Sequence, residues 1–220
     1  MADDDEWKKL PTEQKVQHKS WKARAEGYKE CAKKFGPLDE KSPEFSKYLG
    51  LVKKFVTDSN ELVRIQGLEA TLIFVENAAV AGKTCSEVVS GVIAKCFNSK
   101  PRLRELGIKV CLMYVEIDRN EVVLEEVLKG FENKQPKVVH ACLDLIIAAL
   151  SEFGSKVIAV KPLLKQGIKL LDHRDKNVRE ATKSLFMVIY RWIGPAIRTP
   201  LQAINSVVVL VFEMVLGFVN

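Results

Sequence analysis

The stretch NSKPRLRELG (residues 98–107) marks a point where one apolar helical run ends and another begins. The run before it, EVVSGVIAKCF (87–97), carries Val88, Ile93 and Phe97 at spacings of four or five residues. Such spacing places apolar side chains on one face of an α-helix. The proline of the stretch suits the first turn of a helix, where its missing N–H is not needed. The stretch therefore predicts a turn between two packed helices.

Four other polar breaks of this kind occur along the chain. The five breaks are KSWKAR (19–24), TDSNELVR (57–64), NSKPRLRELG (98–107), NKQPKVVHA (133–141) and DHRDKNVREA (172–181). Their centres lie about 35 to 41 residues apart, close to the period of HEAT and armadillo arrays. We therefore predict an all-α HEAT-repeat solenoid of five helix pairs, followed by an incomplete or atypical sixth. The expected pairs are 12–19 with 22–35, 43–56 with 61–77, 84–97 with 102–117, 120–131 with 137–152, and 158–171 with 177–193.

The breaks also resemble one another in sequence. In three of them an aliphatic residue is followed by arginine and then by a small residue. These residues are Val63-Arg64 with Gly67, Leu103-Arg104 with Gly107, and Val178-Arg179 with Ala181. We expect Asp, Ser or Asn to cap the second helix of a pair, the aliphatic residue to face the core, and the small residue to let the two helices approach closely.

The composition is that of an ordinary globular protein. The 220 residues are 47% hydrophobic and 28% charged, enough for one large domain or two small ones. The five cysteines are odd in number and form no CxxC pair, which favours buried, reduced thiols. The acidic, polar N-terminus and the lack of a long apolar run predict neither a signal peptide nor a membrane span, and hence a cytoplasmic or nuclear protein.

Positive charge is concentrated at the breaks. Because stacked helix pairs repeat the same geometry, the five breaks are expected to share one edge of the stack. The basic residues there are Lys19, Lys22, Arg24, Lys100, Arg102, Arg104, Lys134, Lys137, His173, Arg174, Lys176 and Arg179. With a net charge of +6, this edge predicts an acidic partner, which can be a nucleic acid, an anionic membrane or an acidic protein. The alternative is that these basic loop residues are only solvated.

Trp21 is the most specific candidate for a binding residue. It lies in the first break between Lys19 and Lys22, where an exposed indole among charges is typical of a binding anchor. The alternative is that Trp21 covers the end of the solenoid core. Trp192, in the apolar segment VIYRWIG, is expected to belong to the core.

Catalytic motifs are not found. AGKT (81–84) resembles a phosphate-binding loop, but Asn77 stands where that loop needs glycine, so a helix start capped by Thr84 is expected. His18, His140 and His173 lie in separate repeats without the spacing of metal ligands. We therefore predict a binding protein and not an enzyme, with no cofactor and no metal.

Several stretches resemble the first TOG domain of the large microtubule polymerases, the cytoskeleton-associated, tumour-overexpressed-gene family. They are KLPTEQKVQHKSWKARAEGYKECAKKF, SPEFSKYLGLVKKFVTDSN, GLEATLIFVENAAVAGKT, EVVSGVIAKCFNSKPRLRELG and ALSEFGSKVI. The resemblance covers about residues 6–206 and includes loops as well as helices. It implies a flat paddle of six repeats that binds curved, unpolymerised αβ-tubulin along its intra-repeat loops.

The resemblance also implies roles for individual residues. Trp21, next to Lys22, would dock on β-tubulin, and Lys176 and Arg179 would reach α-tubulin. The remaining expected contacts are Thr57, Asp58 and Asn60 in the second loop, Lys100 in the third and Lys137 in the fourth.

By this resemblance the chain is expected to be a monomeric part of a microtubule plus-end polymerase and spindle-assembly factor. The expected location is the cytoplasmic cytoskeleton at the centrosome or spindle pole, with no binding to nucleic acid or membrane. We expect a TOG domain over residues 1–206, and an atypical apolar segment, VVVLVFEMVLGFVN, at 207–220. The alternatives are a HEAT scaffold for a partner other than tubulin and, from another class, a HEAT-like enzyme that excises damaged nucleic-acid bases.

Overall fold

The computed structural model describes residues 6–197, in which helices follow one another and no β-strand occurs. The chain divides into two compact units, residues 1–123 and residues 124 onward. The predicted apolar segment 207–220 lies outside the described residues, and so does nearly all of the predicted sixth repeat. No described helix is long and apolar enough to cross a lipid bilayer.

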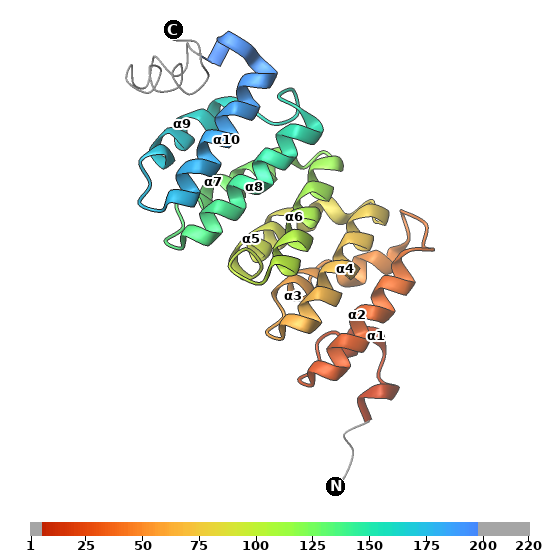
Figure 1. The fold of residues 1–220 in the computed structure, drawn as a ribbon. Coiled ribbons are helices and arrows are strands. Elements are labelled where there is room, and N and C mark those ends of the chain that lie inside the picture. Colours follow the sequence, from red (N-terminus) through yellow and green to blue (C-terminus); the bar gives the residue numbers. More distant parts are fainter. Residues whose placement is uncertain (1–5, 198–220) are drawn as a thin grey trace. The chain divides into compact units, whose positions relative to one another are not determined.

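The first unit contains three helix pairs, and Figure 1 shows them in red to green. Its helices are η1 (Glu6–Lys9), α1 (Thr12–Lys15), α2 (Trp21–Phe35), η2 (Pro43–Tyr48), α3 (Val52–Thr57), α4 (Glu61–Asn77), η3 (Ala81–Thr84), α5 (Cys85–Lys95) and α6 (Pro101–Glu116), where η denotes a 3-10 helix. Within this unit α2 packs on α4 and α4 on α6, while α3 packs on α5. Second helices therefore stack in one layer and first helices in another, as expected for HEAT repeats.

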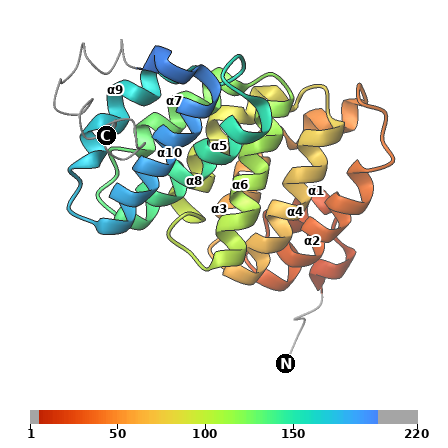
Figure 2. The same cartoon turned by 45° about the horizontal axis from the view of Figure 1, so that its top comes forward.

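The second unit begins within α7 (Asn120–Gly130), which spans the boundary between the units. It continues with α8 (Pro136–Phe153), α9 (Val160–Leu171), α10 (Lys176–Ile193) and η4 (Gly194–Ile197). α8 packs on α10, and α9 packs on α10, so this unit repeats the arrangement of the first (Figure 2).

Two predicted helices differ from the structure. The first, expected over 12–19, ends as α1 at Lys15. The second, expected over 43–56, is divided into η2 and α3 by a turn around Gly50. In η2, Phe45 and Tyr48 are both fully buried, and their spacing of three residues matches the three residues per turn of a 3-10 helix. The other predicted helices agree with the structure to within a few residues at each end. In the helix predicted over 84–97, Thr84 belongs to η3, and α5 begins at Cys85.

Aromatic rings fill the core of the first unit. The ring of Phe35 meets those of Phe45, Tyr48 and Phe74, with centroids 5.6, 4.9 and 5.4 Å away. These rings fix how α2, η2 and α4 pack, and thereby fix the ends of the helices that carry the loops.

Candidate interaction loops

Each helix pair is joined by a short loop. Each loop joins the first helix of a pair to the second helix of the same pair. We number them in chain order as loop 1 (residues 16–20), loop 2 (58–60), loop 3 (96–100), loop 4 (131–135) and loop 5 (172–175). The predicted polar breaks comprise these loops and the helix ends next to them.

Loops 1, 2 and 3 lie together at one end of the first unit. The Arg24 guanidinium, just after loop 1, donates to both carboxylate oxygens of Asp58 in loop 2, from Nε at 2.6 Å and from Nη2 at 2.9 Å. Arg64, just after loop 2, donates from Nη1 to the carbonyl oxygen of Lys95, next to loop 3, at 2.7 Å. The prediction that the breaks share an edge is confirmed for these three loops.

Loops 4 and 5 likewise lie together in the second unit. Arg174 Nη2 in loop 5 donates to the carbonyl oxygen of Lys134 in loop 4 at 3.4 Å. The shared edge is thus confirmed separately within each unit.

A common turn builds loops 1, 2 and 5. In each of these loops, one residue lies two places before the cap residue of the next helix, and its side chain accepts a hydrogen bond from the backbone N–H of that cap residue. Its backbone carbonyl accepts a second hydrogen bond, from an arginine four places after the cap residue. The acceptors are His18, Asp58 and His173, and the arginines are Arg24, Arg64 and Arg179. These bonds satisfy polar backbone groups that the turn leaves unpaired within the helices.

This turn explains two of the three arginines in the sequence pattern, Arg64 and Arg179. Arg179 Nη1 donates to the carbonyl oxygens of His173 and Arg174 at 2.7 and 3.1 Å. Its guanidinium is therefore engaged in holding loop 5, in addition to any contact with a partner. The sequence reading identified the aliphatic-arginine pair but missed that Arg24 is its counterpart in loop 1, because alanine precedes it there.

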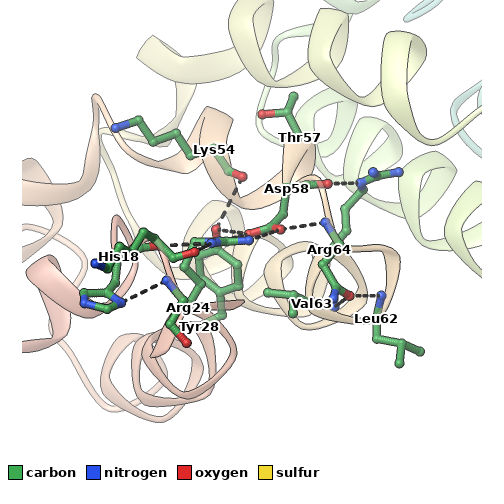
Figure 3. A network of polar contacts seen from close by, with 12 residues as sticks. His18, Arg24, Tyr28, Lys54, Thr57, Asp58, Leu62, Val63 and Arg64 are labelled. Atoms are coloured by element: carbon green, nitrogen blue, oxygen red, sulfur yellow. Dashed lines mark hydrogen bonds and ion pairs between the residues drawn. The ribbon is translucent and has the colours of Figure 1, made fainter. Parts of the chain in front are cut away.

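Loop 2 is organised around the Asp58 carboxylate, whose side chain is only 1% exposed (Figure 3). Besides Arg24, it accepts a bond from the Tyr28 hydroxyl at 3.0 Å and one from the Asn60 N–H at 2.9 Å. Burial of this carboxyl acts to raise its pKa, but the hydrogen bonds from Arg24 and Asn60 outweigh burial, and the pKa lies below its ordinary value. Asp58 is thus ionised at neutral pH and faces the interior.

The other loop 2 candidates also have partners within the chain. Asn60 caps α4 by accepting bonds from the N–H groups of Leu62 and Val63 at 3.0 and 3.3 Å, as predicted for a polar residue at this position. The Thr57 hydroxyl donates to the Lys53 carbonyl at 2.8 Å, and its side chain is half-buried.

Trp21 begins α2 at the edge formed by loops 1 to 3, and its side chain is 49% exposed. The predicted exposed indole is therefore confirmed. The residues that α2 buries in its first two turns are Ala23, Gly27 and Tyr28.

The predicted lysine contacts are all exposed. They are Lys22, Lys100, Lys137 and Lys176, each at or within two residues of a helix start next to a loop. Lys100 forms an ion pair of 3.0 Å with Glu61, whose side chain is 42% exposed. A surface ion pair of this kind is weak enough to be exchanged for a partner's carboxylate.

The core assignment of Trp192 is wrong, since it is 48% exposed near the end of α10, where its ring packs over the backbone of Gly154. AGKT forms η3, and the Thr84 hydroxyl is buried at 2.6 Å from the Tyr114 hydroxyl. Thr84 occupies the cap position of α5, although its side chain makes no cap bond.

The five cysteine thiols are all free and buried, as predicted. Burial raises the pKa of Cys31 and of Cys96 to about 12, so both thiols are protonated at neutral pH.

Comparison with known proteins identifies the family. The family model described as XMAP215/Dis1/CLASP, TOG domain matches residues 6–209. The chain is 52% identical over 209 residues to Protein mini spindles of Drosophila melanogaster, covering 94% of this chain and 10% of that protein. It is 38% identical over 201 residues to Protein MOR1 of Oryza sativa subsp. japonica, covering 90% of this chain and 10% of that protein. The chain thus spans about a tenth of the length of these relatives.

Solved structures show the same fold. A TOG-domain array from a study of tubulin recruitment by microtubule polymerases matches with a TM-score of 0.79 and 22% identity, over 94% of this chain and 46% of that chain. The third TOG domain of Drosophila Mini spindles matches with a TM-score of 0.77 and 18% identity, over 90% of this chain and 89% of that chain. The family model over residues 6–209 and the 52% identity to Protein mini spindles establish that the chain belongs to the XMAP215/Dis1/CLASP family of TOG domains.

Proposed function

We propose that this chain binds the unpolymerised αβ-tubulin dimer through its intra-repeat loops. The observation that carries the proposal is Trp21, an indole half exposed directly after loop 1, which hydrogen bonds connect to loops 2 and 3. Tryptophan is the residue most enriched among binding hot spots, because it brings a large apolar area with few rotatable bonds.

Charge supports the choice of partner. Lys22, Lys100, Lys137 and Lys176 are exposed next to loops 1, 3, 4 and 5, respectively, in a chain of net charge +6. Tubulin is an acidic protein, so these lysines steer the encounter and raise the association rate. In this proposal Trp21 and Lys22 face β-tubulin, while Lys176 and Arg179 face α-tubulin.

The second-loop residues act in two ways in this proposal. Thr57 and Asn60, both partly exposed, lie where a partner at loop 2 can contact them. Asp58 has a buried side chain and acts by holding loop 2 in place through its hydrogen bonds.

The relatives support the same partner. A TOG array of 22% identity is described in tubulin recruitment and assembly by microtubule polymerases. Relatives at 35% and 29% identity are a centrosomal protein of Dictyostelium discoideum and a spindle pole body component of Schizosaccharomyces pombe. We infer that this chain is a non-enzymatic, monomeric tubulin-binding part of a plus-end polymerase or spindle-assembly factor. Its proposed location is the cytoplasmic cytoskeleton at the centrosome or spindle pole.

The test replaces Trp21 and measures binding to unpolymerised tubulin. Trp21→Glu removes the apolar anchor and adds a negative charge that faces an acidic partner. The binding free energy is therefore expected to weaken by about 2–4 kcal/mol. Size-exclusion chromatography of chain and tubulin tests for a 1:1 complex, and isothermal titration calorimetry gives Kd.

Trp192→Glu is the matched control, because Trp192 is 48% exposed, against 49% for Trp21, but lies near the end of α10 that is opposite loop 5. We expect it to bind tubulin like the unchanged chain. Equal binding by a folded Trp21→Glu variant, or equal losses from both changes, excludes the proposed site.

A further inference from the structure

We propose that Arg24 and Asp58 are positioning residues, which hold Trp21 at a fixed place relative to loop 2 so that both meet one partner surface. The inference rests on the proposed function and deepens it. It assigns a role to two residues that have little or no exposed surface of their own, since their side chains are 16% and 1% exposed.

Arg24 ties three segments together. It lies one helical turn after Trp21 in α2, so the two side chains are neighbours on the helix surface. Its Nη1 donates to the carbonyl oxygens of His18 and Lys19 in loop 1, at 2.9 and 3.0 Å. Its Nε and Nη2 donate to Asp58. The planar guanidinium thus fixes loop 1, the first turn of α2 and loop 2 in one geometry, which a lysine cannot reproduce.

Asp58 extends this connection to loop 3 (Figure 3). Its carbonyl oxygen accepts a bond from Arg64 Nε at 2.7 Å, and Arg64 Nη1 in turn donates to Lys95. A series of hydrogen bonds therefore runs from the loop 1 carbonyls that precede Trp21, through Arg24, Asp58 and Arg64, to the end of α5. Because the Asp58 carboxylate faces inward, any effect of this residue on binding must pass through the loops it holds.

The same helix offers a matched control outside this chain of bonds. Glu30 of α2 also accepts two side-chain bonds, from Lys15 at 2.5 Å and from Thr12 at 2.7 Å, and its pKa is likewise lowered. Both of these partners lie in α1, outside the loops. Glu30→Gln and Asp58→Asn each remove one hydrogen-bonded carboxylate charge, from side chains that are 30% and 1% exposed, but only Asp58→Asn disturbs the position of Trp21.

The first experiment needs no tubulin. The indole N–H resonance of Trp21 is assigned as the signal lost in Trp21→Ala, with Trp192 as an internal reference. Asp58→Asn is expected to shift and broaden the Trp21 signal and to leave the Trp192 signal in place, whereas Glu30→Gln leaves both. An unchanged Trp21 signal in folded Asp58→Asn overturns the positioning role.

The second experiment is a double-mutant cycle with unpolymerised tubulin. We expect Asp58→Asn to weaken binding by about tenfold in the presence of Trp21 and by less than about twofold in Trp21→Ala, because residues that act through one contact are not additive. Glu30→Gln leaves Kd unchanged in both backgrounds. Equal losses with and without the indole show that Asp58 does not act through Trp21.

Arg24→Lys keeps the positive charge but lacks the planar guanidinium that donates to loop 1 and Asp58 at once. If Asp58→Asn does not fold, Arg24→Lys replaces it in the double-mutant cycle with Trp21→Ala. If the unchanged chain binds no tubulin, the proposed function fails. The resonance measurement still decides whether Arg24 and Asp58 hold Trp21.

Discussion

At the scale of single residues, burial decides which of the candidate side chains can meet a partner. Trp21 and Lys100 are exposed, whereas the Asp58 side chain is 1% exposed and bonded to Arg24 and Tyr28. Asp58 was expected to contact a partner, because a polar residue in a loop carries no sign in the sequence of the direction in which its side chain points. That direction follows from partners distant in sequence, such as Tyr28, 30 residues before Asp58.

The ionised state of Asp58 makes stability depend on pH. Its pKa is below the ordinary value in the folded chain, so its contribution is fully present above the pKa of the unfolded chain, near 4, and is lost as pH falls through the folded pKa. The free energy of unfolding should therefore decrease from about pH 5 downward. Asp58→Asn should be less stable than the unchanged chain at pH 7, by about 1–3 kcal/mol.

Urea unfolding at several pH values between 7 and 3 measures this effect. Because a protonated carboxyl resembles the amide, the difference between Asp58→Asn and the unchanged chain should shrink toward the acidic end. A difference that stays constant over this range contradicts the ionised, bonded state of Asp58.

At the scale of elements, the repeated turn and the close contacts of small residues shape each helix pair. Gly67 of α4 lies against the backbone of α3, and a Cβ added to it would be 2.1 Å from the Phe55 carbonyl oxygen. At Gly107 of α6, a Cβ would be 2.8 Å from a methyl group of Val92 in α5. The predicted close approach of paired helices is thus confirmed at both glycines.

Gly67→Ala should force α3 and α4 apart and lower the free energy of unfolding by about 2–3 kcal/mol, despite the better helix propensity of alanine. Gly50→Ala is the control, because a Cβ there has no neighbour within 4 Å. Chemical denaturation compares the two variants. Equal stability of Gly67→Ala and Gly50→Ala contradicts the tight α3–α4 contact.

At the scale of the whole molecule, net charge and the basic loop residues govern encounter with an acidic partner. The net charge is +6, and the exposed lysines of the loops lie in both compact units. Long-range attraction of this kind acts on the association rate and is screened at about 8–10 Å in physiological salt.

The association rate constant with tubulin should therefore fall as salt rises, by about tenfold between low and high ionic strength. The double variant Lys100→Gln/Lys137→Gln should show a shallower salt dependence with little change in the dissociation rate. Stopped-flow fluorescence measures both rates. An association rate that salt does not alter argues against steering by the loops.

The sequence by itself determined the helical repeat, the close helix contacts and, within each unit, the edge that the loops share. These features follow from local spacing: apolar periodicity, caps, glycines and breaks that recur at a nearly constant interval. Tertiary structure alone decided that Asp58 and Arg24 face inward, that Trp192 is exposed and that the helix expected over 43–56 is divided. Those outcomes depend on which distant side chains fill the available space and pair the buried polar groups. A linear pattern of residue types does not contain that information.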